Sequence, residues 1–115
     1  KPYLGIVDGV IGGEGNGPLC PEPVHSKVLI IGADPAVLDA TACRLMGFEP
    51  SDVPIVREAF DSEHRLPIST EDINKTMVWD ERVGEEICIS HVLPAIEGGF
   101  KPHFGWKKLN PSFWI

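Results

Sequence analysis

Long hydrophobic runs are missing from this chain. The longest continuous apolar stretch is the four residues Val28–Ile31, whereas about 18 residues are needed to cross a bilayer, and no basic-then-apolar leader is present. Basic residues are also scarce, since 17 acidic residues stand against 10 basic ones and give a net charge of -7. A field of this sign repels phosphate backbones and anionic lipid headgroups. We therefore expect a soluble, cytoplasmic chain with no nucleic-acid partner and no membrane partner.

Cysteine is equally sparse. The three cysteines, Cys20, Cys43 and Cys88, are odd in number and far apart, so they provide neither a disulfide framework nor a CxxC pattern. We expect no iron–sulfur cluster within this chain, and Cys43 is most simply a small buried hydrophobe. The four histidines show no i, i+4 pair and no HExxH spacing, which argues against a zinc hydrolase. The first residue is Lys1 rather than methionine, so we expect a fragment of a longer protein, whose remainder would be a partner.

What is present is an ordinary globular composition. The 115 residues are 43% hydrophobic and 23% charged, values that are typical of a chain with one core. The segments described below alternate between strand and helix patterns. The sequence therefore predicts a single compact α/β domain over residues 1–115, in which a mixed β-sheet packs against two or so helices.

The first third of the chain reads as two strands around a glycine-rich segment. Residues 3–11 are rich in Ile and Val and end at paired glycines, as a strand running into a turn does. Residues 12–18 hold four glycines, an asparagine and a proline, and predict a loop. Residues 19–26 contain two prolines and predict an extended connection. The continuous apolar run at 27–33 predicts a central strand that is covered on both faces.

A helix over residues 35–46 has clear start and stop signals. Asp34 can cap its first turn, Pro35 suits its first position, and Gly47 stands where a C-terminal glycine belongs. At 100° per residue one face is apolar and predicts contact with the sheet, while Ala40 and Arg44 are expected to point away. The residues of this face are Leu38, Ala42, Leu45 and Met46.

The second half of the chain has weaker signals. Residues 54–63 predict a short helix, and residues 76–79 and 86–92 predict two further strands, in which Ile87 and Ile89 share a face. The tail, 94–115, mixes prolines and glycines with five large aromatic residues. Such a segment is too aromatic for a solvated linker. We expect it to dock on this domain, on the remainder of the parent protein, or on a second copy as a homo-oligomer contact.

The glycine-rich loop is the first candidate for binding. Its backbone N–H groups can converge on one point and form a nest for carboxylate or phosphate oxygens, which assigns ligand binding to Gly13, Gly15, Asn16 and Gly17. The pattern matches neither the dinucleotide-binding G-x-G-x-x-G nor the P-loop. A tight structural turn is the alternative. Glu14 keeps the binding hypothesis open, because a carboxylate on such a loop is well placed to face a ligand or a metal.

Four carboxylates near strand ends and helix starts form the second candidate. If Asp8, Glu14, Asp34 and Asp39 converge on one edge of the sheet, they make an oxygen-rich site for a divalent metal. Asp8, Glu14 and Asp39 would be metal ligands, and Glu14 and Asp39 the catalytic acid and base, because a half-buried Asp39 needs a partner. Asp34 would bind ligand or serve as the helix cap alone. An acidic chain also scatters carboxylates by chance.

Several ordered motifs resemble one family. The sequence Ile6-Val7-Asp8-Gly9, the run from Gly13 to Pro18, Gly32-Ala33-Asp34-Pro35, Asp39-Ala40 and Leu45-Met46-Gly47-Phe48 are similar to the C-terminal part of the domain-of-unknown-function 362 family. The later Lys101-Pro102-His103-Phe104-Gly105-Trp106 resembles a motif near the end of many members. The resemblance implies a bacterial or archaeal protein longer than this chain. Some members are fused to ferredoxin-like modules and labelled iron–sulfur proteins, and no general activity is assigned.

Two classes of function follow from the sequence. The first is a domain that binds a small anion, a divalent metal, or both, at the glycine-rich loop and the carboxylates, which the family motifs also contain. The second is a non-catalytic interaction or oligomerisation domain, or an accessory domain of an iron–sulfur redox protein. Whether the chain is an enzyme, and which cofactor it would use, stay open at this point.

Overall fold

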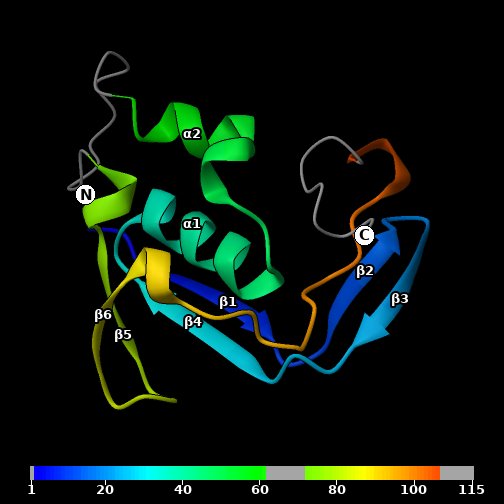
Figure 1. Ribbon diagram of the computed structural model, residues 1–115, viewed down its shortest axis with the longest axis horizontal. Coiled ribbons are helices and arrows are strands. Elements are labelled where there is room, and N and C mark those ends of the chain that lie inside the picture. The colour runs from blue at the N-terminus through cyan, green and yellow to red at the C-terminus, as the bar shows by residue number, and fades with distance from the viewer. Residues whose placement is uncertain (1, 62–71, 107–115) are drawn as a thin grey trace.

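The computed structural model describes residues 2–61 and 72–106 of the chain (Figure 1). These residues form a compact α/β domain of small antiparallel sheets and helices, which confirms the predicted fold class. Neither helix has the length and apolarity needed to span a bilayer within these residues. The elements are β1 (Gly5–Gly9), β2 (Gly12–Asn16), β3 (Cys20–Val24), β4 (Val28–Gly32), α1 (Pro35–Met46), α2 (Pro54–Ala59), β5 (Met77–Asp80) and β6 (Glu85–Cys88), with single 3-10 turns at Pro50–Asp52, Ile73–Lys75, Ile89–His91 and Phe104–Trp106.

The strands pair two by two, as β1–β4, β2–β3 and β5–β6, all antiparallel. The expected single mixed sheet with a central 27–33 strand is therefore not present in the described residues, where β4 pairs only with β1. The physical reason lies in residues 10–27, which hold the β2–β3 hairpin. A parallel arrangement of β1 and β4 would need a crossover of a dozen or more residues that returns the chain to the same end, usually as a helix.

The glycine-rich segment is a strand rather than a loop. Gly12–Asn16 pairs with Cys20–Val24, so the expected loop is confined to the turn at 17–19, which contains a cis Gly17–Pro18 peptide bond. Pro21 and Pro23 lie opposite Gly15 and Gly13. Because proline has no N–H, both prolines must occupy positions that do not donate to the neighbouring strand. Because the two prolines are two residues apart, their missing N–H groups lie along the same edge of β3. β3 can therefore be an edge strand, with this edge facing away from β2.

α1 has the predicted bounds. The Asp34 carboxylate accepts hydrogen bonds from the N–H groups of Ala36 at 3.0 Å and Val37 at 3.4 Å, and Gly47 ends the helix in the left-handed region with φ 87°. The expectation that Ala40 points away from the core is wrong, because Ala40 is fully buried. α1 is covered on two sides in Figure 1, by β1 and β4 on one and by α2 on the other. A helix between two layers needs a wider apolar surface than one stripe.

The second half of the chain completes the core. α2 ends at Ala59, and positions 62 and 63 of the predicted helix lie outside the described residues. Ile89 does not continue β6 and share a face with Ile87 as expected, because it lies in a 3-10 turn, where it is 1% exposed. Of the aromatic tail, Phe100 is buried and Phe104 is 65% exposed, while Trp106 lies against Phe48 with ring centroids 6.3 Å apart. The remaining tail aromatics lie outside the described residues.

Candidate functional site

A cavity of about 600 Å³ lies between α1, β4 and β5. Volumes of this size are typical of ligand-binding clefts. Its lining includes every residue from 27 to 34 and every residue from 76 to 82. The floor is formed by side chains of α1, together with Val92; the α1 residues are Val37, Leu38, Thr41 and Leu45.

Both strands that border the cavity present an unpaired edge to it. β4 pairs with β1 along one edge, and β5 pairs with β6 along one edge. No residue of β1 or β6 lines the cavity, so the cavity lies along the opposite edges. Alternate N–H and C=O groups of a strand point to each side. Within residues 2–61 and 72–106, the outward groups of β4 and β5 therefore have no strand partner.

β4 and β5 each have one side-chain face packed against the core and one exposed. On the inner side, Val28, Ile30 and Val78 are partly buried and pack against the core. On the outer side, four large apolar residues are exposed: Leu29 at 59%, Ile31 at 60%, Met77 at 49% and Trp79 at 64%. Figure 1 shows β4 and β5 as neighbours beside α1. β4 and β5 therefore both border the cavity, and each has an apolar outer face.

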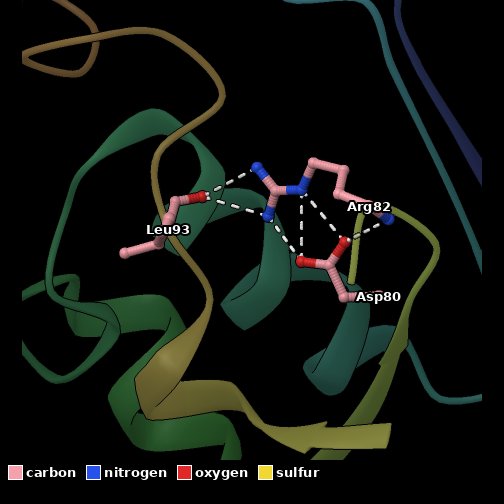
Figure 2. Close-up of polar contacts among 3 residues, drawn as sticks. All are labelled: Asp80, Arg82 and Leu93. Carbon is pink, nitrogen blue, oxygen red and sulfur yellow. Dashed lines mark hydrogen bonds and ion pairs between the residues drawn. The ribbon is translucent and has the colours of Figure 1, made fainter. Parts of the chain in front are cut away.

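An ion pair at the turn of the β5–β6 hairpin lies beside the cavity (Figure 2). The Arg82 guanidinium donates to both carboxylate oxygens of Asp80, with Nη2 to Oδ2 at 2.6 Å, and also to the backbone oxygen of Leu93 at 3.2 Å. Asp80 is almost enclosed, with 9% of its side chain exposed. The hydrogen bonds that Arg82 donates to Asp80 hold the pKa of Asp80 below its ordinary value, and the same hydrogen bonds raise the pKa of Arg82. This contact ties the β5–β6 turn to the segment that follows the hairpin.

Asp80 gives a testable acid dependence. The folded pKa of Asp80 is depressed. Its carboxylate therefore contributes to the free energy of unfolding fully above the ordinary pKa of 3.8, and this contribution is lost as the pH falls through the folded pKa. An Asp80→Asn variant should be less stable than wild type by about 1 kcal/mol at pH 7, a figure kept low by solvent around Arg82. The difference should shrink as the pH falls below 3.8 and disappear once the folded carboxyl is protonated, in denaturation curves recorded across the acid range. Glu85→Gln, an exposed change on the same hairpin, is the control, and a deficit of Asp80→Asn that persists at low pH would contradict the assignment.

The predicted carboxylates do not meet in the structure. Asp8 is exposed and accepts a hydrogen bond from the Val10 N–H at 3.1 Å, and its partner across the sheet is Leu29. Asp34 lies five residues beyond Leu29, at the opposite end of β4, which places it about 16 Å further along at roughly 3.3 Å per residue. Within residues 2–61 and 72–106, no group of three or more His, Cys, Asp or Glu residues could hold a metal ion.

Glu14 contacts the tail segment instead of the other carboxylates. Its carboxylate accepts the Lys101 N–H at 2.7 Å and lies 3.5 Å from the Lys101 ammonium, which also contacts Glu22 at 3.0 Å. Glu14 and Glu22 are directly opposite across β2 and β3, so the lysine offsets a like-charge pair. Both carboxylates raise the pKa of Lys101, Glu22 more strongly. No spacing pattern in the sequence indicates this contact, because it joins residues 87 positions apart.

The amides of the glycine-rich segment are engaged rather than directed at one point. The Gly15 N–H donates to the backbone oxygen of Lys101 at 2.8 Å, and Gly13, Asn16 and Gly17 lie along the hairpin. A strand directs successive N–H groups to opposite sides. The nest expected from the sequence would require them to face one side. The ligand-binding roles of Gly13, Gly15, Asn16, Gly17 and Asp34 stay predictions.

Asp39 is exposed, so the expectation of a half-buried carboxylate is wrong. It lies on the outer side of α1, where solvent removes the need for a partner. Cys43, one turn away, is buried, and burial, together with the charge of Asp39, raises the pKa of its thiol to about 11. The thiol therefore stays protonated at neutral pH, which agrees with its interpretation as a small buried hydrophobe. The catalytic roles of Glu14 and Asp39 and the metal-binding roles of Asp8, Glu14 and Asp39 stay predictions.

Comparison with known families gives one match. Residues 1–44 match the family model described as Domain of unknown function (DUF362). The family assignment made from the motifs is supported. The DUF362 match covers β1 to β4 and most of α1 and ends before Leu45, so the similarity of Leu45–Phe48 and Lys101–Trp106 to DUF362 motifs lies beyond it. No curated protein and no solved structure matches the chain.

The DUF362 match includes one side of the cleft and not the other. β4 and the first part of α1 lie within residues 1–44, whereas β5 and the Asp80–Arg82 pair lie beyond them. Sequence analysis did not identify the cleft residues of β5, namely Met77, Trp79 and Arg82. One pattern in the sequence could have indicated the cleft. Two predicted strands carry apolar side chains on both faces, which is typical of strands that are covered on both faces.

Proposed function

We propose that the chain is a polypeptide-binding domain, which binds another protein in the cleft between β4 and β5. One observation carries this proposal: two unpaired strand edges border one cavity, whose floor is formed mainly by apolar side chains. Exposed strand edges pair readily with another chain, and natural proteins usually cover or blunt them. Large exposed apolar side chains gathered at one cleft are typical of interaction sites. This is the interaction-domain alternative of the sequence analysis, now placed at a different surface from the aromatic tail.

The anion or metal hypothesis has less support. The described carboxylates lie apart, and the glycine-rich segment donates at least one amide within the domain, from Gly15 to Lys101. The accessory role in an iron–sulfur protein has no observation in its favour among the described residues. Polypeptide binding is therefore the function that the geometry supports best.

Two isoleucines provide a matched test of the proposal. Ile6 and Ile31 are cross-strand partners on the same face of β1–β4 and are 61% and 60% exposed, but Ile31 lines the cavity and Ile6 does not. Short random peptides displayed on phage would be selected on the 115-residue chain, and affinities of the enriched peptides measured by fluorescence anisotropy. Ile31→Asp should weaken binding by about tenfold or more, because a charge is then desolvated at the interface. Ile6→Asp should change it by less than about twofold.

Either of two results would overturn the proposal. One is a selection that enriches no peptide with a dissociation constant below about 1 mM, the weak end of measurable binding. The other is an equal loss of affinity in Ile6→Asp and Ile31→Asp. Circular dichroism and thermal unfolding of both variants establish that the fold is retained before affinities are compared.

A further inference from the structure

We infer that the occupant of the cleft is a single extended strand of another protein, inserted between β4 and β5 so that it hydrogen-bonds to both. This inference rests on the proposed function and specifies how the polypeptide binds. The completed sheet would have the order β1–β4–inserted strand–β5–β6 and would cover one side of α1. Extended peptides that add to a sheet edge gain affinity from main-chain hydrogen bonds and specificity from alternate side chains.

The backbone groups of β4 and β5 favour an extended strand as the occupant. β4 contributes five residues and β5 four residues to the cavity borders, and each leaves one edge without a strand partner within the described residues. A helix or a compact small molecule could satisfy few of these alternating N–H and C=O groups. An extended strand matches them on both of its sides, since its own groups alternate with the same period.

The side chains that line the cavity favour an occupant with apolar residues. The α1 floor presents Leu38 and Leu45, both buried, and Thr41, whose hydroxyl already donates to the Val37 backbone oxygen at 2.6 Å. Inward-facing side chains of the inserted strand would therefore meet an apolar surface, in which the Thr41 hydroxyl already has a hydrogen-bond partner. Outward-facing side chains would lie between Leu29 and Ile31 on one side and Met77 and Trp79 on the other. We therefore expect the inserted strand to carry apolar residues at every second position or more often.

The charge of the domain favours a basic partner. The cavity lining contains three acidic residues, Asp34, Asp80 and Glu81, and two basic residues, Lys27 and Arg82. Arg82 is already paired with Asp80. The chain as a whole carries a net charge of -7, which repels a second copy of itself and attracts a basic partner. We therefore assign the cleft to a different protein whose extended segment is flanked by Lys or Arg.

Backbone N-methylation of the selected peptides tests the mode of binding. In a strand that pairs on both sides, the N–H groups of odd residues face one neighbour and those of even residues face the other. Two versions of each peptide, N-methylated at the odd or at the even positions, should each bind at least about tenfold more weakly, because each loses one set of hydrogen bonds. N-methylation of a residue beyond the binding segment is the control and should change affinity by less than about twofold.

The outcomes separate this inference from the proposed function. If only one methylated version is weakened, the strand adds to one edge and insertion is overturned. If neither is weakened, strand pairing is overturned, although polypeptide binding stands. If no peptide is enriched, the proposed function itself fails. Slower amide hydrogen exchange in both β4 and β5 on peptide binding would support insertion, and slowing in one strand alone would contradict it.

Charge and self-association supply the last two measurements. Peptides flanked by Lys should bind at least about threefold more tightly than the same peptides flanked by Glu, and the ratio should fall as salt rises. Equal affinities would overturn the assignment to a basic partner. Sedimentation of the chain alone should show a monomer. A dimer that Ile31→Asp abolishes and Ile6→Asp retains would show that a second copy fills the cleft, and would overturn the assignment to a different protein.

Discussion

Ile89→Ala is expected to lower the free energy of unfolding by about 3 kcal/mol, the usual cost of removing a large buried side chain and leaving a cavity. Ile89 is 1% exposed and belongs to the core cluster of the described residues. Its N–H donates to the backbone oxygen of Thr76 at 2.8 Å, directly before β5. The residue therefore connects the start of β5 to the core. Equilibrium denaturation with urea measures the loss.

The matched control is Ile55→Ala. Ile55 lies on α2 and is 76% exposed, so the same substitution should change stability by no more than about 0.5 kcal/mol. A loss below about 1 kcal/mol for Ile89→Ala would contradict the packing described for the 89–91 turn. Because β5 is one wall of the cleft, Ile89→Ala should also speed amide exchange in β5 more than in β4.

α1 could be predicted to the residue because its signals are local. The helix begins at the Asp34 cap and Pro35 and ends at Gly47. Each of these signals acts on backbone atoms no more than four residues away from it along the chain. Local signals of this kind do not depend on which strands pair. The same holds for the positions of β1 and β4. Each contains β-branched and aliphatic residues and ends at a glycine, and the structure places both inside the predicted ranges.

Strand pairing could not be predicted, because it depends on residues distant in sequence. The apolar run at 27–33 has the composition of a strand buried on both faces, yet Leu29 and Ile31 are exposed within the described part of the chain. The composition and the exposure agree if another polypeptide covers this strand, as proposed above. Glycine-rich β2 was missed for a related reason: its partner β3 contains two prolines, and both segments have low intrinsic strand preference.

The predicted carboxylate site depends on how β1 and β4 pair. Asp8 and Asp34 would share an edge only if β1 and β4 were parallel, since parallel strands end on the same side. In the antiparallel pair, Asp8 lies opposite Leu29, and Asp34 follows the other end of β4. Asp39 was expected to be half-buried because it adjoins the apolar stripe of α1. The cleft itself combines β5 with β4, and no motif joins these two segments.

Gly47→Ala is the second substitution with a large expected effect, about 2 kcal/mol of lost stability. Gly47 has φ 87°, a conformation that costs an L residue about 1 kcal/mol or more. An added Cβ would also lie 3.0 Å from the Cα of Gly99. That neighbour cannot move freely, because the Ala95 and Phe100 N–H groups donate to carbonyls at the end of α1, at 2.8 and 2.7 Å.

Gly84→Ala separates the two causes. Gly84 has φ 77°, and an added Cβ there meets nothing within 4 Å, so it should lose only the conformational part, about 1 kcal/mol. The extra loss in Gly47→Ala, about 1 kcal/mol measured by thermal or chemical denaturation, then reports the close approach of the 95–100 segment to the end of α1. Equal losses in the two variants would mean that this segment yields to a methyl group. Since the same segment continues to Lys101, whose backbone holds Gly15 and Glu14, a Gly47→Ala variant should also show faster amide exchange at Gly15.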